Sequence, residues 1–321
     1  MMQGQPVDDH QRAALIRGLL APQASVPPRY FYDLTGSRLF EVITLLDEYY
    51  LTTTEQRILH QHAHAMAAAF SAAVGDCELL VEPGAGNCEK VRQLLPVLRP
   101  ARYLALDVSI DFVELALQSL RRDFPAVTMA VMAADITQAW PLPDSVGARL
   151  FFYPGSSIGN FTPDEARDLA ARMHAGCQGR GGLLIGVDLV KDRQVLHAAY
   201  NDALGVTAAF NLNLLRHLNR LIGSDFQLQQ WEHQAFFNES QSRIEMHLRA
   251  RESLRVRWQR PAASGLPDGR AFAVGERIHT ENSYKYTADA FAALLRDAGF
   301  TRVHRWTDER EYVGVFLATT G

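Results

Sequence analysis

The sequence predicts an α/β fold with a mostly parallel sheet, and three observations indicate it. First, the apolar run at residues 79–81 leads into a glycine turn and then into apolar residues at helical spacing, which is typical of a strand, a tight turn and a helix. Second, similar apolar runs recur along the next hundred residues and end in acidic or glycine-rich segments. Third, Phe300–Trp306 and Tyr312–Ala318 alternate like strands around a polar turn, which predicts an antiparallel hairpin at the end of the chain.

The first turn reads Glu82-Pro83-Gly84-Ala85-Gly86. Glycine has no Cβ, so the backbone at Gly84 and Gly86 can come close to a ligand. In open α/β sheets, nucleotides bind where a strand's carboxyl end meets the N-terminus of the following helix. A pair of glycines also simply ends many strands, so this motif needs support from the rest of the sheet.

That support comes from four further strand-like runs, at residues 102–107, 128–132, 149–153 and 182–187. Asp107 ends the first of them, about 20 residues after Gly86, where a carboxylate typically accepts the ribose hydroxyls of a nucleotide. Asp135 and Asp188 follow two of the others. Because the carboxyl ends of parallel strands meet at one edge of a sheet, we expect these acids to lie along the same edge.

The spacing of the glycines distinguishes between nucleotides. A dinucleotide-binding turn needs a third glycine where Glu89 stands, and the P-loop spacing is absent. The pattern Glu82-x-Gly84-x-Gly86, with Asp107 and then Asp135, resembles the Rossmann-like S-adenosylmethionine-dependent methyltransferases. The resemblance implies that the glycines border the methionine part of the cofactor, that Asp107 holds the ribose and that Asp135 contacts the adenine. A nicotinamide-binding oxidoreductase and a catalytically silent amino-acid-binding module are the alternatives from other classes.

The composition favours an enzyme that acts on a small molecule. Of the 321 residues, 47% are hydrophobic and 21% charged, which is ordinary for a soluble globular protein. The formal net charge of −4 gives no basic surface for nucleic acid. Three cysteines with no close pair suit a reducing cytoplasm. The polar N-terminus lacks a signal peptide, and no apolar run reaches the roughly 18 residues of a membrane span. We expect a cytoplasmic monomer.

Three helices are predicted before the first strand, at residues 11–20, 37–45 and 54–73, the last with an N-cap among Thr52–Thr54. Aromatic residues gather between Tyr30 and Tyr50, where core packing is the ordinary explanation. Within the third helix, His60 and His64 share a face. A third ligand is not evident, so the pattern favours solvated histidines, and no metal is expected.

The regular succession of strands and helices predicted for the sheet ends at Asp188. Residues 191–219 have helical spacing, and four runs then alternate like strands, at 231–238, 242–250, 254–259 and 272–278. The helix predicted at 287–298 is again part of the nucleotide-binding fold. We therefore predict a methyltransferase domain at 1–190 and 281–321, with an N-terminal helical segment at 1–75, and an inserted α+β substrate-recognition domain at 191–280.

The whole chain resembles a narrower family, the histidine-specific α-N-methyltransferases of ergothioneine biosynthesis, which convert histidine into its trimethylated betaine, hercynine. The resemblance runs from about residue 27 to 318. It is carried by eight segments in the family's order: 28–33 (PRYFYD), 48–50 (EYY), 155–160 (GSSIGN), 188–192 (DLVKD), 199–200 (AY), 206–211 (VTAAFN), 243–246 (RIEM) and 280–285 (TENSYK).

This resemblance implies a role for each matching position. The cofactor residues it implies are Tyr32, Gly84, Lys90, Asp107, Asp135 and Ile136. Asn160 and Tyr200 are expected to hold the α-amine and carboxylate of L-histidine. Tyr49 and Met246 are expected to line the side-chain pocket, Glu281 and Ser283 to bind the imidazole, and Asn282 to tune the preference. The implied reaction is three methyl transfers from S-adenosylmethionine to the α-amine. The same transfer to a thiohistidine or a tryptophan derivative is the alternative.

The residue chemistry agrees with an imidazole ligand. A neutral imidazole has one N–H donor and one acceptor nitrogen, which a carboxylate and a hydroxyl can serve. In extended chain, Glu281 and Ser283 point to the same face because side chains alternate with a period of two. The ordinary alternative for Glu281 is a surface ion pair with Lys285.

Overall fold

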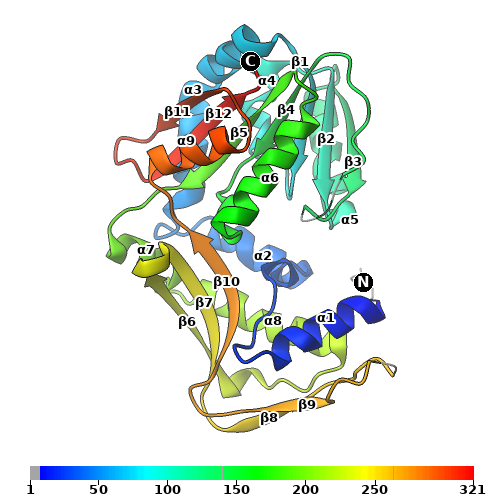
Figure 1. Ribbon diagram of the computed structural model, residues 1–321, viewed down its shortest axis with the longest axis vertical. Helices are drawn as coiled ribbons and strands as arrows, with labels where there is room; N and C mark the ends of the chain where they lie inside the picture. The colour runs from blue at the N-terminus through cyan, green and yellow to red at the C-terminus, as the bar shows by residue number, and fades with distance from the viewer. Residues whose placement is uncertain (1–7, 137, 139, 263) are drawn as a thin grey trace. The chain divides into compact units, whose positions relative to one another are not determined.

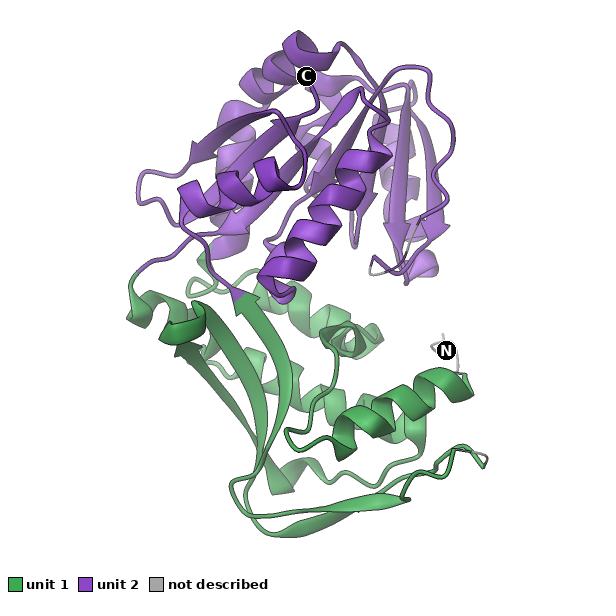
Figure 2. Ribbon diagram, in the orientation of Figure 1, with its two compact units in different colours: residues 1–50, 192–283 green, residues 51–191, 284–321 purple. Residues whose placement is uncertain are grey.

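The structure is a computed structural model, and it describes residues 8–136, 138, 140–262 and 264–321. The polar N-terminal residues 1–7 lie outside this range. The chain forms two compact units: unit 1 consists of residues 1–50 and 192–283, and unit 2 of residues 51–191 and 284–321 (Figure 2). This division joins residues 1–50 to the inserted segment, whereas the prediction from the sequence places them in the methyltransferase domain.

Unit 2 contains a seven-stranded sheet (Figure 1). Its strands are β1 (Cys77–Pro83), β2 (Arg102–Asp107), β3 (Thr128–Ala133), β4 (Ala148–Tyr153), β5 (Gly181–Asp188), β11 (Arg302–Thr307) and β12 (Val313–Thr319). The order is β11-β12-β5-β4-β1-β2-β3. Strands β1 to β5 pair in parallel, and β12 runs antiparallel to both β5 and β11. The predicted Rossmann-like sheet with an antiparallel C-terminal strand is thus confirmed.

Helices cover both faces of this sheet. On one face, α6 (Pro163–Gly176) and α9 (Ala288–Asp297) pack their apolar sides on β1, β4, β5 and β12 in one buried cluster. Helix α3 (Tyr50–Val74) lies on the other face, where Phe70 reaches Gly182 of β5. Helix α5 (Ile110–Asp123) packs on β2 and β3. The carboxyl ends of the parallel strands form the edge at which the predicted cofactor residues of this unit lie.

Unit 1 is built on a three-stranded sheet in the order β10-β7-β6. Its strands are β6 (Trp231–Asn238), β7 (Arg243–Ala250) and β10 (Arg277–Tyr284), and β8 (Leu254–Arg257) pairs separately with β9 (Gly269–Phe272). Helix α8 (Val206–Ile222) packs on β6 and β7, and α1 (Asp9–Leu20) and α2 (Leu34–Ile43) pack on α8. A short helix, α7 (Arg193–Tyr200), contacts β6 and β7.

Three predicted elements are wrong in detail. The expected helix after the glycine turn is a 3₁₀ turn, Val91–Gln93, and a short helix, α4 (Leu95–Leu98), because Pro96 has no N–H with which to continue a helix from residue 91. The N-cap expected among Thr52–Thr54 is inside α3, which begins at Tyr50. The strand expected at 272–278 is interrupted by a turn at which Gly275 has a positive φ of 80°.

His60 and His64 are both exposed on α3, in agreement with the solvated patch that the sequence favours. Among the described residues, no helix has the length and hydropathy needed to cross a bilayer.

Candidate active site

The glycine turn in unit 2 is held against the end of β2. The backbone N–H of Gly84 donates to the carbonyl of Leu106 over 2.7 Å, and that of Gly86 donates to Oδ2 of Asp107 over 3.1 Å. Both glycines have a positive φ, 69° and 56°, which a side chain would disfavour. A Cβ built on either glycine would meet no protein atom within 4 Å, so the space beside the turn is open. These residues fit a cofactor that approaches the backbone closely.

Asp107 has a fixed orientation. Besides the bond from Gly86, its Oδ1 accepts the backbone N–H of Ser109 over 2.8 Å, at the start of α5. Each carboxylate oxygen has a second lone pair with which to accept a hydroxyl hydrogen. The strand end, the turn and the first residues of α5 therefore position a carboxylate suited to bind a ribose.

Replacement of Asp107 by alanine is expected to weaken binding of S-adenosylhomocysteine about 10- to 100-fold, because hydrogen bonds to a charged group contribute about 1.5–3 kcal/mol. Calorimetric titration measures the dissociation constant. Asp111→Ala, which removes an exposed carboxylate from the first turn of α5, is the matched control. An Asp107 variant that binds as tightly as the control would exclude Asp107 from the cofactor site.

Lys90, also predicted to contact the cofactor, belongs to a cluster of polar residues that the sequence patterns do not reveal. Its ammonium lies 2.5 Å from Oε2 of Glu55, which is buried on α3. The Glu55 carboxylate also accepts the backbone N–H of Gly155, and a Cβ at Gly186 would overlap it. The available signal was helical spacing, since Glu55 lies four residues after Leu51 and four before Leu59, on the buried stripe of α3.

The carboxyl group of the glycine motif itself, that of Glu82, lies in β1. Glu82 is buried and accepts a hydrogen bond of 2.5 Å from the Tyr103 hydroxyl of β2. Burial raises the pKa of Glu82 to about 8, although the Tyr103 bond and the Lys90 charge act in the opposite direction. Glu82 is therefore mostly protonated at neutral pH, and it adds little negative charge beneath the glycine turn.

The remaining predicted residues of unit 2 also lie at the carboxyl edge. Asp135 and Ile136 follow β3, both partly buried, and Ile136 packs against the buried cluster below α6. Asn160 ends a 3₁₀ turn, Ser157–Asn160, which follows β4. The sequence therefore placed these side chains correctly relative to the strands of this unit.

In unit 1, five of the predicted substrate residues are buried, and Tyr49 is one of them. Glu281, Ser283 and Met246 lie on β10 and β7, and Tyr200 ends α7. The Tyr200 hydroxyl donates to Oγ of Ser283 over 2.8 Å. The ordinary alternative for Glu281 placed its carboxylate at the surface, whereas both Glu281 and Lys285 are buried, and the Lys285 ammonium pairs with Asp188.

A series of contacting aromatic rings in unit 1 begins at Tyr200. Tyr49 meets the Tyr200 ring edge-on, with ring centroids 6.3 Å apart, and Phe40 meets Tyr49 in the same way. Tyr32 packs edge-on against Phe40 and Phe210. The aromatic residues near the N-terminus thus form one connected group that includes both predicted tyrosines, which gives the predicted pocket residues a rigid aromatic surround.

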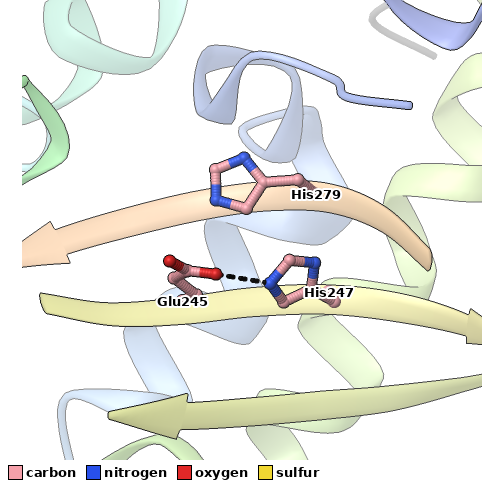
Figure 3. A group of neighbouring side chains, drawn as sticks. All are labelled: Glu245, His247 and His279. Carbon is pink, nitrogen blue, oxygen red and sulfur yellow. Dashed lines mark hydrogen bonds and ion pairs between the residues drawn. The ribbon is translucent and has the colours of Figure 1, made fainter. Parts of the chain in front are cut away.

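One group of side chains in unit 1 could hold a metal ion. Glu245 and His247 of β7 and His279 of β10 each offer a ligand atom, and the three atoms lie within 4.8 Å of one another (Figure 3). The Glu245 carboxylate already accepts hydrogen bonds from Arg243 and from Nε2 of His247. The Arg243 guanidinium opposes a second cation on that carboxylate, so the arrangement favours a hydrogen-bonded network over a metal centre.

This network predicts a pH dependence of stability. Burial lowers the pKa of His247 to about 4, below its ordinary value of 6.5. Between these two values the unfolded chain binds a proton that the folded chain does not, so the free energy of unfolding rises with pH across this window. We expect His247→Gln to remove part of this slope when denaturant unfolding is measured from pH 4.5 to 7. Identical slopes for the two proteins would contradict the burial of a neutral imidazole.

The fold and the cofactor-side geometry together define the class of the protein. A Rossmann-like sheet closed by an antiparallel strand, with an open glycine turn beside Asp107, is the architecture of an S-adenosylmethionine-dependent methyltransferase.

The comparisons with known proteins narrow this class. The sequence profile of the family described as "Histidine-specific methyltransferase, SAM-dependent" matches residues 11–320, so the chain belongs to that family. Histidine N-alpha-methyltransferase of Mycolicibacterium smegmatis is 39% identical over 94% of this chain and 92% of its own. The protein of the same name from Mycobacterium tuberculosis is 36% identical over 96% and 94%. Ergothioneine biosynthesis protein 1 of Neurospora crassa is 30% identical over 89% of this chain and 32% of its own.

Proposed function

We propose that this chain transfers methyl groups from S-adenosylmethionine to the α-amine of L-histidine, in three rounds that give hercynine for ergothioneine biosynthesis. The family membership and the names of the mycobacterial relatives support this reaction. The observation that carries the proposal is the buried pair of Glu281 and Ser283 on β10, next to the hydroxyl of Tyr200.

This pair suits an imidazole ring. The Ser283 hydroxyl accepts the Tyr200 hydroxyl, and a hydroxyl that accepts one hydrogen bond can also donate one, here to the acceptor nitrogen of the ring. Glu281 then accepts the ring N–H. A side chain without these groups would leave buried polar atoms without partners, at a cost of about 1–3 kcal/mol each. Histidine is thereby preferred to an amino acid with a plain hydrocarbon side chain.

The methyl transfer requires the protein mainly to position the amine and the methyl donor. The bound donor would supply an electrophilic methyl group on its sulfonium. We assign Asn160 and Tyr200 to hold the amine and carboxylate of the amino acid without adding charge, and Tyr49 and Met246 to line the pocket. The edge-on rings of Tyr49 and Tyr200 offer aromatic surface to a methylated ammonium, which interacts favourably with such surfaces.

On the cofactor side, we assign Gly84, Asp107, Asp135 and Ile136 to bind the donor, together with Lys90 and Tyr32. The Lys90 ammonium can serve a carboxylate while it stays paired with Glu55, because it has three donor hydrogens. We further propose that the enzyme is a cytoplasmic monomer and that transfer needs no metal.

The decisive experiment incubates purified protein with S-adenosylmethionine and an amino acid, and identifies the products by mass spectrometry. Histidine is expected to yield mono-, di- and trimethylated products, faster than a thiohistidine or tryptophan, and chelator should leave the rate unchanged. A reversed substrate order would support the related-substrate alternative. Histidine binding without formation of S-adenosylhomocysteine would indicate a silent binding module. A melting temperature raised by NADH, but not by S-adenosylhomocysteine, would indicate an oxidoreductase.

A further inference from the structure

The alternation of side chains in β10 changes phase in its middle. Nε2 of His279 donates to Oδ1 of Asn282 over 2.9 Å. In a regular strand, residues three apart point to opposite faces and are too far apart for this bond. The burial pattern changes at the same place: residues 278 and 280 are buried before it, residues 281 and 283 are buried after it, and residues 279 and 282 are half-buried. These observations indicate a β-bulge between Thr280 and Glu281.

The bulge determines which face of the sheet Glu281 and Ser283 meet. The Thr280 hydroxyl donates to the carbonyl of Met246 and to the side-chain oxygen of Asn211 on α8, so Thr280 faces the helix-covered side. In a regular strand Glu281 and Ser283 would then point to the opposite side. Ser283 instead accepts the hydroxyl of Tyr200, whose own carbonyl is bonded to His233.

His233 connects Tyr200, and through it Ser283, to the helix-covered face. Its second ring nitrogen bonds to Asn211 of α8, and Ala235, two residues further along β6, pairs with Met246. The β6–β7 ladder is regular along its whole length. The phase change therefore belongs to β10 alone, and it brings the two predicted imidazole-binding side chains to the face that carries Met246 and Tyr200.

On the opposite face, the bond from His279 to Asn282 is part of a larger network. The ring of His279 lies 4.9 Å from that of His247, which stacks flat on Phe236 and bonds to Glu245 (Figure 3). Arg243 and Asn238 also bond to the Glu245 carboxylate. The ring of His279, which donates to Asn282, therefore packs against a hydrogen-bonded group of the neighbouring strands, so the Asn282 side chain is held by a donor that is itself fixed.

We propose that His279 and Asn282 are positioning residues: their hydrogen bond holds the bulge that directs Glu281 and Ser283 toward the histidine ring. This inference rests on the proposed function, because it takes Glu281 and Ser283 as the groups that bind the ring. It gives Asn282 a role behind the binding pair, in place of the direct substrate contact that the resemblance implies.

The test is a double-mutant cycle with Asn282→Leu, His279→Leu and the double variant. Each single change is expected to raise the KM for histidine about tenfold, with kcat and the KM for S-adenosylmethionine within about twofold of wild type. The double variant should be no worse than either single variant, because both remove the same bond. Asn282→Asp keeps an acceptor oxygen for His279 and should restore the wild-type KM at pH 8.

Arg249→Gln is the matched control, since it removes an exposed ion pair with Glu232 from the same face of β7. If Asn282→Leu raises the KM while His279→Leu does not, Asn282 contacts the substrate and the positioning role is wrong. The role is also wrong if both variants keep the wild-type KM. Should a leucine variant fail to fold, Asn282→Ser and His279→Gln complete the same cycle.

The failure of the proposed function is recognised separately, because wild-type protein would then not methylate histidine. In that case a crystal structure of Asn282→Leu still tests the bulge. Side chains 281 and 283 are expected to leave the face that carries Met246, and an unchanged strand would overturn the inference.

Discussion

Asp188→Asn is expected to lower the free energy of unfolding of unit 2 by about 3–5 kcal/mol, the usual cost of removing one partner from a buried ion pair. Asp188 ends β5 and is completely buried, and it pairs with two ammonium groups, those of Lys191 and Lys285. Burial by itself raises the pKa of Asp188, but the two lysines outweigh it and hold the pKa below its usual value. The asparagine variant leaves both lysine side chains buried without a carboxylate to pair with.

The loss should be smaller in alkaline solution. Burial lowers the pKa of Lys191 to about 8, and in the variant the loss of the carboxylate lowers it further, so at pH 9.5 one of the two ammonium groups is neutral. Urea unfolding at pH 7 and at pH 9.5 measures both values. Asp289→Asn is the control, because its pair with Arg305 is exposed and contributes at most about 1 kcal/mol. A variant as stable as this control at pH 7 would show that Asp188 does not hold the lysines.

Glu281→Ala is expected to raise the KM for histidine about 10- to 100-fold and to leave the KM for S-adenosylmethionine unchanged. The reason is that the buried ring N–H loses its acceptor, which costs about 1–3 kcal/mol. Because the contact exists both before and during methyl transfer, kcat should change little. Steady-state kinetics with each substrate varied in turn separates these constants.

Glu281→Gln refines this prediction. The amide keeps one acceptor oxygen at nearly the same place, so its KM should lie between those of wild type and Glu281→Ala. Phenylalanine, which offers no N–H, should be used equally poorly by all three proteins. If Glu281→Ala retains the wild-type KM for histidine, Glu281 has no part in binding the ring.

Several features of this protein follow from its sequence because their causes are local. The run at 102–107 is a strand that ends in Asp107, as expected, and α9 begins just after Thr287, whose hydroxyl caps it. Parallel strands bring their carboxyl ends to one edge, so strand prediction alone placed Gly84, Asp107 and Asp135 at that edge. The residues 300–318 form the expected antiparallel hairpin. The single helix predicted after the glycine turn is wrong, because Pro96 interrupts the apolar spacing and starts a separate short helix.

The sequence by itself determined the kind of sheet, the edge that carries Gly84, Asp107 and Asp135, and the extended segment that carries Glu281 and Ser283, since periodicity and turn chemistry act over a few residues. Only the tertiary structure decided that Glu55 pairs with Lys90, that Lys285 is buried and pairs with Asp188, and that residues 1–50 pack with 192–283. It also decided the change of phase in β10. The physical reason is that burial and ion pairing depend on which distant segments meet, and neither spacing nor propensity encodes that within a single stretch of chain.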